Sequence, residues 1–214
     1  MMAALKGTTN LCKVLTPPDF YTSIASRFLL EDERPLFILQ SVADDYCFTN
    51  LALVHLDGFG PVGKKRSARR SPWRDYILSN VVLDTAGVAD IDIEVKFYLR
   101  ARDGSGAREY SIDVKKDQVG LATCLYKALV SIAEAQAEGV RAEARLRLAL
   151  STIAATGSVA ASSDPLALFR AIATDLHSAE EAHAPRDVSS FFARYVLFEG
   201  GAPPPPRGPP PRTE

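Results

Sequence analysis

The sequence predicts an α+β fold in which a run of antiparallel strands is followed by one long helix. Between residues 36 and 115, short apolar runs and alternating apolar and polar residues are separated by turn residues, which is typical of strands. From residue 117 onward, apolar residues recur every three or four positions, which is the helical period. Strands gathered before a helix favour an antiparallel sheet over a parallel sheet with alternating helices.

The segment before the first strand is predicted to hold a mobile arm, residues 1–16, and then one helix. Thr16-Pro17-Pro18-Asp19 combines a capping threonine, prolines at the helix start and an early carboxylate. Phe20, Ile24 and Phe28 follow at helical spacing. We therefore expect a helix with one apolar face beginning near Thr16.

The strands follow in order and are predicted from local composition. The clearest is Asp90 to Arg100, in which every second residue is apolar, so one face is buried and the other is in water. Asp103-Gly104-Ser105-Gly106 joins it to a second alternating strand, and together they predict a hairpin. The expected extended segments are 36–39, 46–56, 64–73, 76–83, 90–100 and 110–114.

A long helix is predicted to close the sheets, and a helical extension follows it. Leu121, Leu125, Leu129 and Ile132 form an apolar stripe that continues toward Gly139. Beyond that glycine the sequence becomes rich in alanine, arginine and leucine. We divide the chain into a mobile arm (1–16), a β-domain with its leading helix (17–138), a helical extension (139–200) and a disordered proline-rich tail (201–214).

Four short motifs occur together in this chain: Phe48-Thr49-Asn50, Gly63-Lys64-Lys65 with Pro72-Trp73, Thr85-Ala86-Gly87, and Asp90-Ile91-Asp92-Ile93-Glu94-Val95-Lys96. Together they resemble the bacterial pleckstrin-homology-like (PH-like) family over about residues 30–133. The resemblance implies a seven-stranded antiparallel β-barrel or sandwich capped by a C-terminal helix, without catalytic activity, in a family whose members tend to form homo-oligomers. No shared ligand-binding residues follow from it.

Composition excludes several classes of function. Lys and Arg number 25 against 26 Asp and Glu, a net charge of -1, so no global field attracts nucleic acid or anionic membrane. The three cysteines are widely spaced, which favours free thiols in a cytoplasmic protein over disulfides or a zinc site. His55, His177 and His183 form no catalytic or metal-binding pattern. We expect no enzyme activity, no cofactor and no metal.

One strand is unusually basic and is the candidate site for anions or lipid headgroups. Arginine forks suit phosphate groups, and eukaryotic PH domains gather such headgroups with basic residues. These cations nevertheless fall near the fourth strand, away from the usual headgroup site, so a charged edge strand that prevents aggregation is the alternative. Nucleic acid is not an expected partner, because few aromatic residues lie among the cations. The candidate residues are Lys64, Lys65, Arg66, Arg69, Arg70 and Arg74.

A concentrated aromatic face is predicted in the last helix of the extension. Such a face must be buried, either on the protein's own helices or across a subunit boundary, which makes it the candidate assembly face. We therefore predict a noncatalytic PH-like interaction or scaffolding protein that self-associates or binds another protein. The alternative is a peripheral membrane protein that binds anionic lipid through Lys64 to Arg74. The face comprises Val188, Phe191, Phe192, Tyr195 and Val196.

Overall fold

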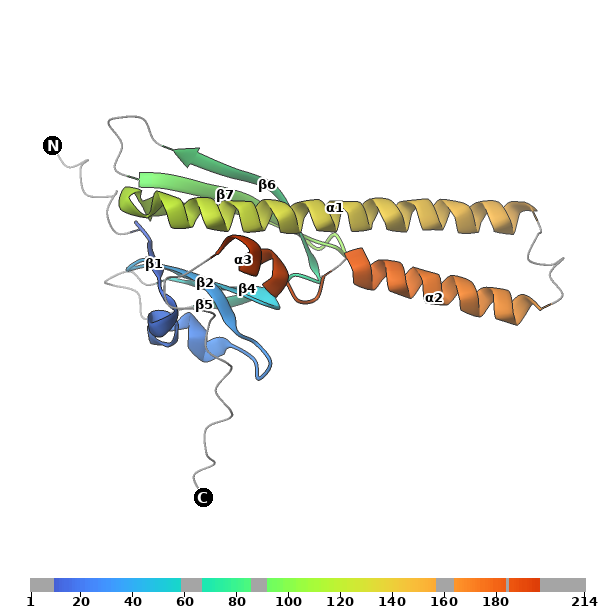
Figure 1. Ribbon diagram of the computed structural model, residues 1–214, viewed down its shortest axis with the longest axis horizontal. Helices are drawn as coiled ribbons and strands as arrows, with labels where there is room; N and C mark the ends of the chain where they lie inside the picture. The colour runs from blue at the N-terminus through green and yellow to red at the C-terminus, as the bar shows by residue number, and fades with distance from the viewer. Residues whose placement is uncertain (1–9, 59–66, 86–91, 157–163, 184, 197–214) are drawn as a thin grey trace, which may run out of the picture.

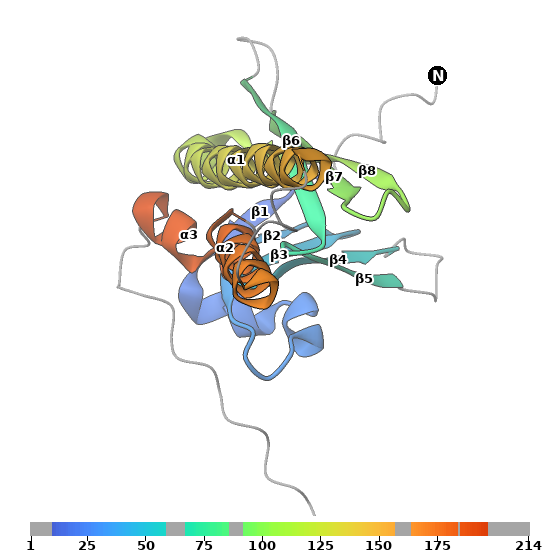
Figure 2. The same cartoon turned by 90° about the vertical axis from the view of Figure 1, so that its right-hand side faces the viewer.

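The computed structural model confirms the α+β class and the antiparallel sheets (Figure 1). Two sheets form an open sandwich, and a long helix packs against them. The same arrangement is seen end-on in Figure 2, where the long helix lies alongside both sheets. The structure describes residues 10–58, 67–85, 92–156, 164–183 and 185–196.

The first sheet has five strands in the order β1-β2-β3-β4-β5, and every pair is antiparallel. Its first strand lies inside the range for which the sequence predicted a mobile arm. That strand is held because it pairs with β2 and because Cys12, just before it, bridges to Val114 of the second sheet. The strands are β1 Lys13–Leu15, β2 Pro35–Gln40, β3 Asp45–Thr49, β4 Ala52–Asp57 and β5 Ser67–Pro72.

The second sheet has three strands, β6 Tyr76–Thr85, β7 Asp92–Ala101 and β8 Ala107–Lys115. The predicted hairpin between the last two is present, and Gly104 adopts φ 76° in its turn, a conformation that glycine permits. The described strands number eight, one more than the resemblance implied. Of these, β1 was not expected, and the expected segment 46–56 is two strands, β3 and β4, joined by a turn at Asn50. Alternation in β7 is as predicted, since Ile93, Val95, Phe97 and Leu99 are all buried.

The predicted leading helix is not an α-helix, and this expectation was wrong. Two 3-10 turns replace it, η1 Pro17–Thr22 and η2 Ala25–Phe28. The chain between them is extended at Ser23, and the backbone N–H groups of Ile24 and Ala25 donate to the carboxylate of Asp45. These amides therefore bond to the first sheet instead of to a preceding helical turn.

The helices are α1 Val119–Thr156, α2 Pro165–His183 and α3 Ser189–Tyr195, with a short 3-10 turn η3 Lys116–Gln118 before α1. The boundary that the sequence places after residue 138 falls in the middle of α1, which is continuous there. The first half of α1 packs on the sheets. Its second half and α2 form a hairpin that projects away from them (Figure 1).

The main core lies between the sheets, α1 and α3. On α1 the predicted stripe is confirmed, since Leu125, Leu129 and Ile132 are fully buried. Burying such side chains contributes about 1.5 to 3 kcal/mol each, so this stripe fixes the helix on the sheets. A smaller cluster, which includes Phe20 and Ala25, lies on the other face of the first sheet under η1 and η2.

Candidate functional site

The basic strand was the first candidate site, and the structure describes only part of it. Lys64, Lys65 and Arg66 lie outside the described residues. Arg69 donates from Nη1 to Asp57 Oδ2 at 2.7 Å at the surface. Arg70 instead pairs with the buried carboxylate of Glu33. Arg69 and Arg70 are adjacent in β5, but their guanidinium groups pair with different carboxylates.

The position of β5 in its sheet supports the alternative explanation of its charge, that of an edge strand protected from aggregation. The order of the first sheet ends at β5, so this strand is an edge strand. Charged residues on an edge hinder pairing with another chain. Arg74 lies beyond the strand, in the turn toward β6, and forms no ion pair with any described residue. It therefore belongs to a different surface from Arg69 and Arg70.

Arg70 completes a buried network at the Phe48-Thr49-Asn50 motif. The Thr49 hydroxyl and the Arg70 guanidinium both bond to the carboxylate of Glu33, which is 4% exposed. A buried carboxylate requires such partners, because an unpaired charge in the interior is costly. This arginine is accordingly used inside the chain.

The asparagine of the same motif holds the segment that leads into α3. Asn50 Oδ1 accepts from the backbone N–H of Arg34 at 2.8 Å, and Asn50 Nδ2 donates to Asp187 Oδ2 at 3.0 Å. The backbone N–H of Val188 donates to the Asn50 carbonyl at 2.9 Å. The motif therefore has a structural role that joins a strand turn to a segment far away in sequence.

The aromatic face of the last helix packs on this chain's own core. Val188 is 0% and Phe192 2% exposed, and the ring of Phe192 lies 6.3 Å from that of Phe48. Phe191, Tyr195 and Val196 are only partly buried at the edge of the same cluster. Burial on the protein's own core, one of the two alternatives for this face, thus accounts for Val188 and Phe192. Phe191, Tyr195 and Val196 retain exposed surface.

One histidine, His55, and two cysteines, Cys12 and Cys47, are buried. His55 Nε2 is 3.3 Å from Asp44 Oδ1, and its ring stacks on Tyr46 with centroids 4.3 Å apart. Burial raises the pKa of the Cys12 thiol to about 12, and burial raises the pKa of Cys47 well above its ordinary value. Both thiols are therefore protonated at neutral pH and are poor nucleophiles. Within the described ranges, His, Cys, Asp and Glu side chains form no group of three suited to a metal ion.

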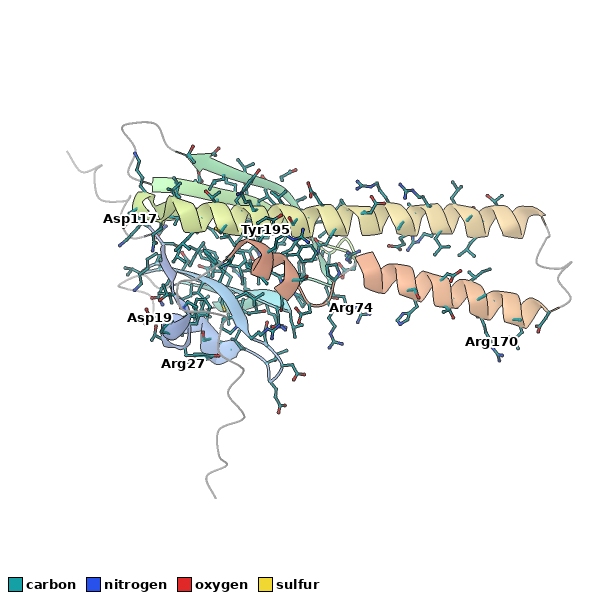
Figure 3. The ribbon with its side chains drawn as sticks, in the orientation of Figure 1. Asp19, Arg27, Arg74, Asp117, Arg170 and Tyr195 are labelled. Atoms are coloured by element: carbon teal, nitrogen blue, oxygen red, sulfur yellow. The ribbon has the colours of Figure 1, made fainter. Side chains whose placement is uncertain are left out.

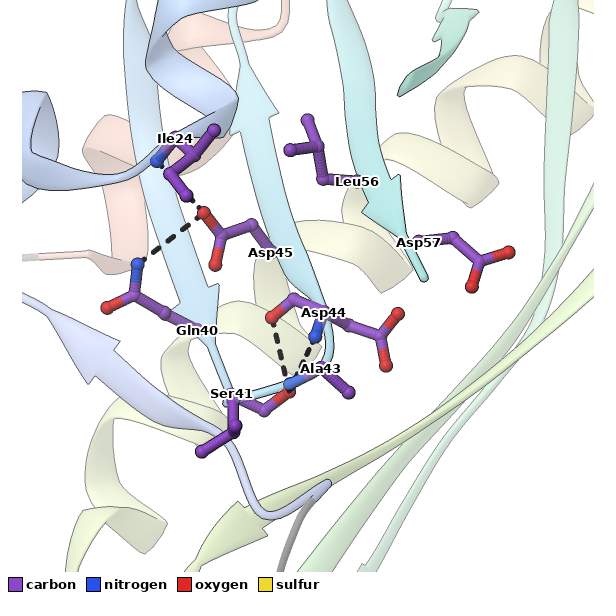
Figure 4. Close-up of a pocket in the computed structure, with 9 residues that line it drawn as sticks. Ile24, Gln40, Ser41, Ala43, Asp44, Asp45, Leu56 and Asp57 are labelled. Atoms are coloured by element: carbon purple, nitrogen blue, oxygen red, sulfur yellow. Dashed lines mark hydrogen bonds between the residues drawn. The ribbon is translucent and has the colours of Figure 1, made fainter. Parts of the chain in front are cut away.

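A small pocket lies beside the turn between β2 and β3 (Figure 4). Its volume is about 130 Å³, which is small beside the ~300 to 1,000 Å³ of typical ligand sites. One of its carboxylates, Asp45, already accepts hydrogen bonds from the Ser23 hydroxyl and the Ile24 backbone. This pocket is part of the local structure that holds η2 on the sheet.

A larger cleft of about 810 Å³ lies where the helical hairpin leaves the sheets. It brings together Arg74, Arg102, Arg147 and Arg186, of which only Arg74 was predicted as a site residue. The other three were missed because they are far apart in the sequence and form no local motif. We call this feature the Arg102 cleft. Figure 3 shows Arg74 at this junction.

The hairpin itself exposes large apolar side chains. Leu148 on α1 is 68% exposed, and on α2 Leu166 is 57% and Phe169 67% exposed. Leu146 and Leu150, on the same half of α1, are half-buried. These exposed residues were not predicted from the sequence, because an apolar residue in a helix does not itself indicate whether another element covers it. No helix in the described ranges has the length and apolarity needed to cross a membrane.

Comparison with known proteins places this architecture among bacterial proteins. The uncharacterized protein YvbH of Bacillus subtilis (strain 168) is 40% identical over 130 residues, which span 60% of this chain and 61% of that relative. The chain therefore covers about three fifths of the curated relative it matches. A PH-domain-containing protein from Exiguobacterium sibiricum 255-15, known from a crystal structure, is 33% identical, with a TM-score of 0.70 over 87% of this chain and 100% of the other.

The family model agrees with the fold and with the motifs. The bacterial PH domain model matches residues 8–133, which include both sheets and the first half of α1. The match begins before the range of the sequence resemblance and so includes β1, η1 and η2. The chain belongs to the bacterial PH domain family.

Proposed function

We propose that this chain is a noncatalytic interaction module that self-associates through its helical hairpin. PH-like domains serve protein or lipid interaction, and the family is generally noncatalytic. The observation that carries the proposal is the exposure of Leu148, Leu166 and Phe169 on the part of the molecule that projects from the sheets. Exposed apolar surface that gathers on one part of a protein is typical of protein contact sites.

Among the described residues, no third element covers the outer faces of the two-helix hairpin. Covering one large apolar side chain contributes about 1.5 to 3 kcal/mol, so a second hairpin packed on the first gains stability from each residue named above. A two-fold dimer would combine the hairpins into a four-helix bundle, the smallest arrangement that gives such helices a shared core.

Charges on the hairpin do not oppose this contact. Arg141 and Arg145 pair with Glu138, and Arg147 pairs with Glu143, all along α1. These pairs are local to one helix, so no large field of one sign separates two copies. Self-association is therefore compatible with the net charge of -1.

Lipid binding through the basic strand has less support. Arg70 is committed to the buried Glu33, and Arg69 to Asp57. Releasing Arg70 for a headgroup would leave a buried carboxylate unpaired, which is strongly destabilising. For this reason we favour self-association through the hairpin over lipid binding through this strand.

Light scattering after size exclusion tests the proposal on the full chain. One chain has a mass of 23.2 kDa. We expect the wild type to show at least twice this mass, and the double variant Leu148→Ser/Phe169→Ser to show the mass of one chain. Phe28→Ser is the matched control, because Phe28 is 50% exposed but lies on η2, away from the hairpin. A wild type that is monomeric at high concentration contradicts self-association, and a monomeric Phe28→Ser variant contradicts the assignment to the hairpin.

A further inference from the structure

We propose that the Arg102 cleft binds a phosphate-bearing anion. The cleft lies between the β5–β6 turn, the β7–β8 turn, α1 and the end of α2, so it exists only where the sheets and the hairpin meet. Its volume of about 810 Å³ lies within the ~300 to 1,000 Å³ of typical small-ligand sites. The site does not depend on whether the chain self-associates.

Arg102 provides the central observation. Its Nε and Nη2 atoms are buried and have no hydrogen-bond partner among the described residues. A guanidinium remains charged at any physiological pH, and leaving its donors buried without acceptors costs free energy. Native structures pair nearly all such groups, so an orphaned one indicates a missing partner. The partner that a guanidinium fork fits is a planar or tetrahedral oxyanion.

The other cations around the cleft are also available. Arg74 and Arg186 form no ion pair with any described residue, and both side chains are exposed. Arg147 is different, because it pairs with Glu143 within α1. Three arginines from separate parts of the chain therefore reach one cleft without a carboxylate partner.

Three carboxylates also line the cleft, and the net charge that an anion would meet depends on how these carboxylates are paired. Glu143 is paired with Arg147, and Asp103 accepts from the backbone N–H of Ser105 at 2.8 Å within its own turn. Asp75 and Asp103 are the two acidic residues of the lining that have no paired cation among the described residues. Three unpaired arginines face these two carboxylates, so the cleft keeps a surplus of one positive charge, which favours an anion.

The frame around Arg102 is fixed by hydrogen bonds. The Arg102 backbone N–H donates to the Asp75 carbonyl at 2.9 Å, which joins two turns of the lining. On α1, the fully buried Gln136 donates to the carbonyls of Trp73 and Tyr76 and accepts from the Leu78 N–H. The helix thus passes the cleft in a set position, and the anion site is preorganised.

Isothermal titration of the full chain with inorganic pyrophosphate tests for free anions. Co-sedimentation with phosphatidylcholine vesicles, with and without phosphatidylinositol 4-phosphate, tests for the same group on a lipid headgroup. We expect binding in at least one arm, and about tenfold or greater weakening in Arg102→Gln and in Arg186→Gln through loss of charge-assisted hydrogen bonds. Binding of pyrophosphate assigns a soluble ligand, and binding of the phosphoinositide vesicles alone assigns a headgroup.

Arg27→Gln is the matched control, because Arg27 is exposed on η2, far from Arg74 in Figure 3. Thermal melts of the unliganded variants provide the second readout. Because Arg102 lacks partners in the unliganded chain, Arg102→Gln should melt at or above the wild-type temperature. Absence of binding in both arms, or equal weakening in Arg27→Gln, overturns the proposal. A large fall in the melting temperature of unliganded Arg102→Gln shows a structural arginine and also overturns it.

Discussion

Asn50 Nδ2 lies 3.0 Å from Asp187 Oδ2, so a turn of the first sheet is hydrogen-bonded to the segment that begins α3. The first of these residues belongs to the stretch matched by the bacterial PH domain model, and the second lies outside it. The C-terminal helix is therefore attached to the part of the fold that the family model matches by a specific contact as well as by the buried Phe192.

A double-mutant cycle on this pair should give a coupling free energy of about 1 kcal/mol. We expect Asn50→Ala to destabilise more than Asp187→Ala, since Asn50 also accepts from the Arg34 N–H. Urea denaturation followed by the fluorescence of Trp73, the single tryptophan, measures each variant. Additive effects of the two substitutions would contradict a direct interaction.

The contact between Asn50 and Asp187 also predicts that the stability of the fold depends on pH. Burial raises the pKa of Asp187, but hydrogen bonds from Asn50 and Ser189 and the charge of Arg34 outweigh it, and the pKa falls below its ordinary value of 3.8. A carboxyl with a lowered pKa in the folded state stabilises the fold above its unfolded pKa and loses that contribution as pH falls through the folded value.

The wild type should therefore exceed Asp187→Asn in stability at pH 7, and the gap should narrow as pH falls below 3.8. Urea denaturation at a series of pH values measures the gap. Comparison of Asn50→Ala with Asn50→Ala/Asp187→Asn is the control, because removal of Asn50 takes away one cause of the shift. A gap that is constant with pH would show that the charge of Asp187 does not contribute.

Arg70 and Arg69 are adjacent in sequence but are predicted to differ strongly in their effect on stability. Arg70→Gln leaves the buried Glu33 without its cation and should cost about 3 to 5 kcal/mol. Arg69→Gln, the matched control, removes an exposed pair with Asp57 and should cost at most about 1 kcal/mol. Equal losses in thermal or urea denaturation would show that the Glu33 network is not a stability element.

The strand pattern explains why the fold was predictable. Alternation in Asp92–Ala101 and the helical stripe of Leu125, Leu129 and Ile132 are local signals, and each is confirmed by burial. The prediction of a leading helix was wrong although its capping residues and apolar spacing are those of a helix. The reason is that the Asp45 carboxylate accepts hydrogen bonds from the backbone amides of residues 24 and 25, which a helix would have used. Such a contact, formed across 20 residues of sequence, leaves no local signature.

The candidate sites were less predictable, because they too depend on contacts between residues that are far apart in the sequence. A run of cations in Lys64 to Arg74 is visible in the sequence, but the partners Glu33 and Asp57 that occupy two of them are not. The Arg102 cleft gathers residues from positions 74, 102 and 186, which only the tertiary structure brings together. Sequence therefore indicated where charge is dense, and the structure shows which charges are unpaired.

The buried amide of Gln136 gives the last prediction. It is 0% exposed and bonds to the carbonyls of Trp73 and Tyr76 and to the N–H of Leu78, so it fastens α1 to the corner between the two sheets. Gln136→Leu preserves most of the volume but leaves these backbone groups buried without partners, and should cost about 3 kcal/mol or more.

Glu134→Leu is its control, because Glu134 is exposed on the same helix and a surface change should stay within about 0.5 kcal/mol. Urea denaturation measures the cost, and hydrogen exchange at Leu78 reports the lost bond directly. If Gln136 fastens the helix, Gln136→Leu should accelerate exchange at Leu78 while the amides in the centre of β7 remain protected. Unchanged protection at Leu78 would show that the corner is held by apolar packing, with the glutamine contributing little.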